Sequence, residues 1–201
     1  MQITTALTTA LKEWSVAVDA IARGETIMLL RKGGIKESQG HFSAQSDRAI
    51  LFPTFEHQKP ELLKPAYRPL VEPVTPGWHP EHITLKAWAD ITHIFRTDDA
   101  DQVAALSAFH IWEPQLALER LKWKPKQPLY VLILRAYRLS APVDVAWQPS
   151  YGGCRSWIEL AAGATGSGLS REGSEAAISD ADYDAQVEAI AHLLSRPAVN
   201  T

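Results

Sequence analysis

The chain has 201 residues, of which 46% are hydrophobic, and its formal net charge is −3. This length suits one hydrophobic core and is short for two, and the charge excludes a protein coated in positive potential, so any nucleic-acid contact must come from a local patch. The single cysteine excludes an internal disulfide and a zinc site with four cysteine ligands. Because no run of about 18 apolar residues and no signal sequence is present, we expect a cytoplasmic protein that does not contact membranes.

The first 34 residues predict a helix and then a strand. The helix ends at Gly24, and the strand, Ile27 to Leu30, leads through Arg31 and Lys32 into a Gly-Gly turn. Two cations beside glycines suit a phosphate group, and they equally suit a charged hairpin turn. Five apolar side chains, spaced alternately by four and three, define the buried face of the helix: Leu7, Leu11, Trp14, Val18 and Ile21.

The middle of the chain predicts two strands separated by a long loop. The first strand covers residues 48–52 and ends at Pro53, after which Thr54 caps a short helical turn through Gln58. Five prolines between residues 64 and 80 indicate an extended surface connection. Apolar residues then alternate with mostly polar ones from Ile83 to Ile91, as in a half-buried strand.

The remainder of the chain predicts helices, then strands, then a last helix. Short helices are expected over residues 103–109 and 114–121, and the continuous apolar run "LYVLILRAYRL" indicates a central strand. The segment "RSWIEL" indicates one more strand. Ser179 and Asp182 have the spacing of a capping box at the start of the last helix. We therefore expect an α+β fold, a single domain with a mixed or antiparallel sheet and packed N- and C-terminal helices. Its expected parts are an α+β region over residues 1–160, a flexible link over 161–177 and a helix over 178–196.

Three histidines invite comparison with metal ligands. His79 and His82 flank a proline, and His93 falls on a predicted strand, so their spacing fits no metal-binding template. We expect surface histidines, with no metal and no other cofactor.

Residues 120–138 are basic and aromatic, whereas residues 172–188 carry six acids and no Lys or Arg. Cations bind phosphates and aromatic rings stack on bases, so the first segment suits a nucleic-acid strand. The alternative is that the acidic C-terminal helix neutralises this segment within the fold. The cations are Arg120, Lys122, Lys124, Lys126, Arg135 and Arg138, and the aromatic residues are Trp123, Tyr130 and Tyr137.

Cys154 follows two glycines in "YGGCRSW". A catalytic thiol needs a base, for which His57 and His110 are the candidates, and the glycine N–H groups can face a developing oxyanion. The alternative is that Cys154 is a small buried side chain where the backbone bends beside a strand.

Six blocks in order along the chain carry a family resemblance: "ALKEW", "LLRKGGI", "FPTFEHQKPELLKP", "HIWEP", "RLKWKPKQPLYVLILRAYRL" and "YGGCRSW". Together they resemble the bacterial family of domain of unknown function 1802, from about Ala10 to Leu160. The resemblance implies no established activity. Some relatives are joined to a restriction-endonuclease-like domain, which implies a restriction or DNA-defence setting and a partner of that kind.

Polar, cationic and aromatic residues of these blocks fall at strand ends or on loops, where functional sites are built. We expect them to line one pocket that binds a nucleic acid or a nucleotide phosphate. The alternatives are an enzyme that uses Cys154 with His57 or His110, and a protein-interaction or regulatory subunit that uses the acidic C-terminal helix. The expected ligand-binding residues are Arg31, Lys32, Glu56, Trp112, Arg120, Lys124, Arg135 and Tyr151.

Overall fold

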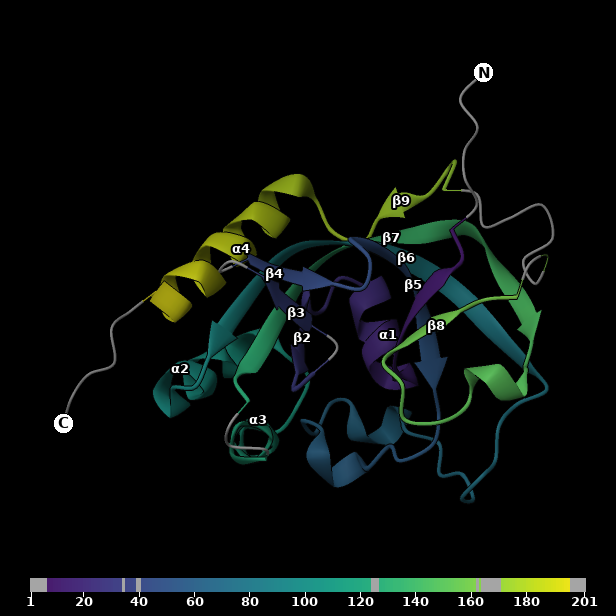
Figure 1. Ribbon diagram of the computed structural model, residues 1–201, viewed down its shortest axis with the longest axis horizontal. Coiled ribbons are helices and arrows are strands. Elements are labelled where there is room, and N and C mark those ends of the chain that lie inside the picture. The colour runs from purple at the N-terminus through teal and green to yellow at the C-terminus, as the bar shows by residue number, and fades with distance from the viewer. Residues whose placement is uncertain are drawn as a thin grey trace.

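The computed structural model describes residues 7–33, 35–38, 41–123, 127–161, 163 and 171–195 (Figure 1). No helix among them is long and apolar enough to cross a membrane. The strands are β1 (Thr9–Trp14), β2 (Met28–Arg31), β3 (Ile35–Ser38), β4 (His41–Ala44), β5 (Arg48–Thr54), β6 (His82–Thr97), β7 (Leu129–Ala146), β8 (Trp157–Glu159) and β9 (Glu175–Ala176). The helices are α1 (Ser15–Ala22), α2 (Ala100–Ala105), α3 (Pro114–Lys122) and α4 (Asp180–Ser195), with 3-10 turns η1 (Pro60–Leu62), η2 (Arg68–Leu70), η3 (Leu106–Phe109) and η4 (Pro149–Tyr151).

The main sheet is mixed, with strand order β2-β7-β6-β5-β1-β8 and with β9 added beside β7. Strands β1 and β5 are parallel, and the other pairs are antiparallel. Two register shifts interrupt the long β6–β7 ladder, and such irregularities bend a sheet. The predicted α+β domain with a mixed sheet is confirmed.

Helix α1 lies inside the curl of the sheet, where it contacts β1, β5, β6 and β7 (Figure 1). Six of its eight residues are buried. Val16 and Ala20 pack in a core cluster with Trp112 and the apolar side chains of α4, whereas Val18 and Ile21 pack in a second cluster with residues of β6 and β7. A helix that is apolar on nearly every side is what such an enclosed position requires.

The predicted N-terminal helix was wrong over its first half, because residues 9–14 form strand β1. Leu11 packs in one core cluster and Ala10 in another, so successive side chains point to opposite faces as in a strand. The strand lies between β5 and β8 and is buried on both faces. Its apolar residues are spaced by four and three, which also fits a helix, but pairing with the two neighbouring strands decides the structure. The predicted stop at Gly24 agrees with the end of α1 at Ala22.

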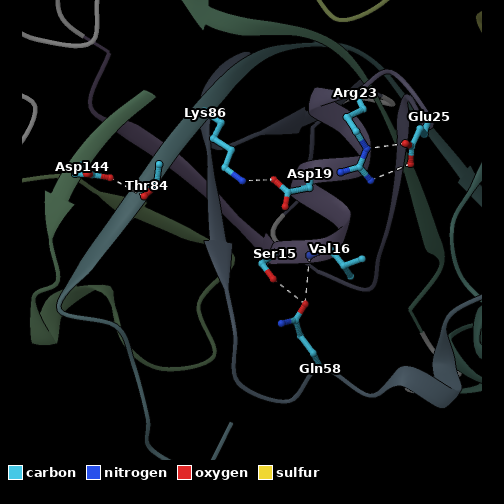
Figure 2. A network of polar contacts seen from close by, with 9 residues as sticks. All are labelled: Ser15, Val16, Asp19, Arg23, Glu25, Gln58, Thr84, Lys86 and Asp144. Atoms are coloured by element: carbon cyan, nitrogen blue, oxygen red, sulfur yellow. Dashed lines mark hydrogen bonds and ion pairs between the residues drawn. The ribbon is translucent and has the colours of Figure 1, made fainter. Parts of the chain in front are cut away.

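The loop after β5 is tied to the start of α1 (Figure 2). The side-chain oxygen of Gln58 accepts hydrogen bonds from the Ser15 hydroxyl (3.1 Å) and the Val16 N–H (3.3 Å), two groups at the open N-terminus of the helix. The predicted helical turn capped by Thr54 is absent: Thr54 ends β5, its hydroxyl donates to the Glu13 carbonyl (3.1 Å), and residues 56–57 form a turn. Gln58 thereby fixes the path of this turn.

The C-terminal part belongs to the same fold. The predicted capping box is present, since the Asp182 N–H donates to the Ser179 hydroxyl (3.1 Å), and α4 packs on the core through Tyr183 and Ile190. The segment expected to be a flexible link ends in a strand that the sequence did not predict, β9, which pairs with β7. Residues 162 and 164–170 of that segment lie outside the described residues.

Candidate functional site

Three neighbouring depressions share lining residues, so we call the three together the groove and name each of them by position. The wide depression (about 590 Å³) reaches Gln45 and Trp123, the middle depression (about 260 Å³) reaches Trp14 and His57, and the aromatic depression (about 250 Å³) reaches Trp147. Residues lining both the wide and middle depressions are Arg31, Arg120, Cys154, Arg155 and Ser156. Residues lining both the middle and aromatic depressions are Lys12, Thr54, Glu56 and Gly153.

The curl of the sheet creates this groove by bringing its two edges together. Arg31 ends the edge strand β2, yet its guanidinium donates to the Lys12 carbonyl of β1 (2.7 Å) and to the hydroxyl of Ser156, which precedes the other edge strand, β8 (3.4 Å). It also forms an ion pair with the buried Glu13 carboxylate (3.0 Å). Arg31 is therefore fixed where the two edges meet.

Arg120 places a second guanidinium beside the first. It donates to the Leu30 carbonyl (2.7 Å) and lies over the ring of Trp112 at 5.3 Å from the ring centroid. Burial lowers the pKa of Arg120, and repulsion from Arg31 acts in the same direction while Glu13 opposes it. Trp112, which is buried, thus supports Arg120 from below and does not line the groove.

Lys12 and Lys32 are cations used mainly to hold the chain together. The Lys12 ammonium donates to the carbonyls of Tyr151 (2.5 Å) and Gly153 (2.8 Å), and burial, followed by repulsion from Arg155, lowers its pKa. The Lys32 ammonium donates to the Leu121 carbonyl at the end of α3 (2.8 Å) and to the Gln127 carbonyl (2.5 Å), and burial lowers its pKa. Lys32 lines the wide depression with its hydrogen-bonding capacity largely used.

The turn after β5 brings Glu56 and His57 to the middle depression. Glu56 accepts a hydrogen bond from the Gly77 N–H (2.7 Å), which connects this turn to the proline-rich loop. His57 has φ of 63°, and it is the one non-glycine residue with positive φ in the described part of the chain. A backbone held in this sparsely populated region is a frequent feature of binding sites.

Cys154 is exposed on the groove, so the prediction of a small buried side chain was wrong. It follows Gly153, whose φ of 78° gives the turn its left-handed geometry. The neighbouring Arg155 is exposed and donates to the Ser150 carbonyl (2.8 Å). Cys154 and His57 line the same depression.

His110 is not brought to Cys154. It is 3% exposed and lines none of the three depressions. Its Nδ1 accepts a hydrogen bond from the Trp112 N–H (3.2 Å), and its Nε2 is buried without a hydrogen-bond partner among the described residues. Burial lowers its pKa to about 4, with repulsion from Lys64 in the same direction, so His110 is a neutral core residue.

This neutral histidine predicts loss of stability in acid. In the unfolded chain the imidazole binds a proton below about pH 6.5, whereas in the fold it does so only near pH 4, so the unfolded state holds more protons in between and is favoured as pH falls. We expect the free energy of unfolding, measured with urea, to fall between pH 7 and pH 4.5 by about 2 kcal/mol more in the natural protein than in His110→Asn. The amide oxygen of Asn can still accept from the Trp112 N–H. Equal losses in the two proteins would show that His110 is not buried and neutral.

The basic segment divides between two parts of the molecule. Arg120 faces the groove, whereas Arg135 is buried, pairs with Asp180 of α4 and lies over the Tyr183 ring (4.7 Å). Arg138 pairs with Glu175 (3.6 Å). The expected neutralisation by the acidic C-terminal segment therefore applies to Arg135 and Arg138, which lie away from the groove. Lys124 and Lys126 lie outside the described residues.

The structure thus brings together most of the predicted site residues and adds others. Tyr151 is buried beneath the aromatic depression, where its ring packs edge-to-face on Phe52 at 5.6 Å. Lys12 and Glu13 were missed, although two charges in the middle of the apolar segment "ALKEW" were the available signal. The aromatic side chains of Phe55, Trp78, His79 and Trp147 were also missed, because nothing in their spacing indicates that they meet.

These features define a single α+β domain whose curled mixed sheet carries an arginine-lined groove. The chain matches the model of the family described as domain of unknown function (DUF1802) over residues 10–189, and it belongs to that family. No curated protein matches it. Among solved structures, it is similar to the crystal structure of a mutant of the ZmASCH protein from Zymomonas mobilis, with 12% sequence identity, a TM-score of 0.44, and coverage of 78% of this chain and 90% of that chain.

Proposed function

We propose that the groove binds a phosphate group carried by a nucleotide or a nucleic-acid strand. One observation carries the proposal: the five residues that line both the wide and the middle depressions include three arginines and no acid. This concentration of positive charge lies in a chain whose formal net charge is −3, so it is local. Guanidinium groups match phosphate oxygens in geometry and donate two hydrogen bonds at once.

The charge of this cluster is only partly compensated within the protein. Glu13 neutralises Arg31, whereas Arg120 and Arg155 donate to main-chain carbonyls and form no ion pair with the described part of the chain. A carbonyl orients a guanidinium without cancelling its charge. Partial burial of Arg120 strengthens its attraction for an anion, because the surroundings screen charge less than water does.

Binding should therefore depend on salt and on the groove arginines. We expect a fluorescently labelled single-stranded 10-mer to bind with a double-logarithmic salt slope of roughly −0.7 per phosphate contacted. Arg155→Gln should weaken binding about three- to tenfold and reduce that slope by about one contact. A nucleoside triphosphate used as competitor distinguishes a free nucleotide from a strand as the preferred source of the phosphate.

Arg138→Gln is the matched control, because Arg138 is also an exposed arginine but pairs with Glu175 and does not line the groove. It should leave both affinity and slope unchanged. The proposal fails if neither the 10-mer nor the triphosphate binds, if binding is insensitive to salt, or if Arg138→Gln and Arg155→Gln have equal effects.

A second candidate function rests on the shared depression of Cys154 and His57. If His57 activates the thiol as a base, Cys154 reacts with iodoacetamide at pH 7 several-fold faster in the natural protein than in His57→Gln. Glutathione under the same conditions gives the rate of an unassisted thiol. Equal rates in the two proteins would remove the enzymatic alternative.

A further inference from the structure

We infer that the aromatic depression is a subsite for an unpaired nucleobase, an inference that rests on the proposed phosphate site and specifies its ligand. The depression adjoins the arginine cluster and is lined by aromatic residues from three separate segments of the chain, of which Phe52 and Tyr151 are buried and form its floor. The aromatic residues are Phe52 and Phe55 around the end of β5, Trp78 and His79 of the proline-rich loop, and Trp147 and Tyr151 after β7. Planar heterocycles bind between or upon such rings by stacking.

The rings are already arranged in pairs. His79 stacks on Trp147 with ring centroids 3.4 Å apart and an angle of 5° between the planes. Trp78 packs edge-to-face on Phe55 at 6.0 Å and 89°, and 43% of Trp78 remains exposed. Much of this large apolar side chain is therefore accessible to a ligand.

The position of the depression matches the construction of a nucleotide. It shares Lys12, Thr54, Glu56 and Gly153 with the middle depression, whose other side is formed by Arg31, Arg120 and Arg155. A ligand with its phosphate at the arginines and its base at Trp78 would place the sugar near the shared residues. Neighbouring sites for a phosphate and a base suit a ligand built from nucleotide units.

The charges orient such a ligand in one direction. The Glu56 carboxylate lies where the middle and aromatic depressions meet and accepts from the Gly77 N–H of the aromatic depression, so it repels phosphate there and can accept an N–H from a base edge. A cation such as a methylated ammonium group also suits aromatic rings and a carboxylate. It is disfavoured here because Lys12 lines the same depression and Arg155 the adjoining one.

The subsite selects against duplex ligands. In a duplex the bases are stacked on each other and paired, so a ring such as Trp78 reaches a base only if the base leaves the stack, which costs a few kcal/mol. The ligand class is therefore a free nucleotide or a single strand.

The test compares three 10-mers of equal backbone charge: a single strand with bases, an abasic single strand, and the strand annealed to its complement. We expect the strand with bases to bind about tenfold more tightly than the abasic strand. Trp78→Ala should remove this difference while leaving binding of the abasic strand unchanged, and Trp78→Phe should retain most of it. His79→Ala should weaken binding of the strand with bases. The matched control is His93→Ala, which should leave this binding unchanged. His93 is also an exposed ring stacked on an aromatic partner, but it does not line the aromatic depression.

The outcomes separate the two proposals. If both single strands bind equally and Trp78→Ala changes neither, the base subsite is refuted while the phosphate site stands. If the duplex binds as tightly as the single strand, or if trimethyl-lysine binds at Trp78 and the strands do not, the inference is overturned. If no strand binds in any form, the phosphate site and the base subsite are both refuted.

Discussion

Lys12→Met is expected to destabilise the protein by about 3 kcal/mol and to weaken ligand binding. Methionine has a similar volume but no donors, so the carbonyls of Tyr151 and Gly153 would lose their charged partner in a largely buried place. Each such hydrogen bond contributes about 1.5–3 kcal/mol, and an unsatisfied carbonyl carries its own cost. Because residues 151–153 lead directly into Cys154 and Arg155, the wall of the groove should loosen at the same time.

The measurement is urea unfolding at pH 7, with Lys86→Met as the matched control. Lys86 makes its ion pair with Asp19 (2.8 Å) at the surface, where removal of one partner costs less than about 1 kcal/mol (Figure 2). Equal losses for the two substitutions would contradict the role assigned to Lys12 as the anchor of this wall.

Gly24→Ala should cost about 3 kcal/mol, because two requirements meet at this glycine. It has φ of 74° and ends α1, where the Gly24 N–H donates to the Ile21 carbonyl (3.0 Å) and the Glu25 N–H to the Ala20 carbonyl (2.9 Å). A Cβ there would also lie 2.0 Å from Cγ2 of Ile178 and 2.7 Å from the Ala177 carbonyl oxygen. The left-handed backbone contributes about 1 kcal/mol to the loss, and overpacking contributes about 1–3 kcal/mol.

Gly77→Ala separates these two contributions. Gly77 has φ of 79° but no atom within 4 Å of an added Cβ, so only the backbone cost applies, about 1 kcal/mol. Thermal or urea unfolding of both variants gives the difference. If Gly24→Ala is no more destabilising than Gly77→Ala, the segment before α4 does not pack on the end of α1 as the structure shows.

Local sequence patterns correctly predicted the elements for which tertiary packing favours the same structure as the local pattern. The apolar run of β7 is buried over its first eight residues, and the Ser179–Asp182 capping box starts α4, as expected. Strand β1 was predicted as a helix because Leu7, Leu11 and Trp14 have helical spacing. Residues 9–14 form a strand because they pair with β5, more than 30 residues away, and with β8, more than 140 residues away. Two-residue β9 carries no periodic signal, and its pairing with β7 is a tertiary effect.

Part of the candidate site could be predicted from the sequence, because several of its polar and charged residues lie at the ends of predicted strands or in glycine turns. Arg31, Glu56 and Cys154 follow buried strands or glycine turns and do line the groove. Arg135 belongs to the same basic segment as Arg120, but it packs against α4 and does not line the groove. The sequence could not predict this, because a charge pattern does not record which way a strand residue points. His110 was indistinguishable from His57 in sequence, and only burial separates the neutral core residue from the exposed one.

The most direct test of the proposal that the groove binds phosphate is amide chemical-shift mapping of the ¹⁵N-labelled protein during titration with the single-stranded 10-mer. We predict that the largest shifts cluster at residues 12–14, 31, 54–57 and 153–156, and that Arg155→Gln reduces them. Shifts centred on Arg135 beside α4 and Arg138 beside β9 would contradict the account, and so would the absence of shifts at a concentration of strand that saturates known single-strand-binding proteins.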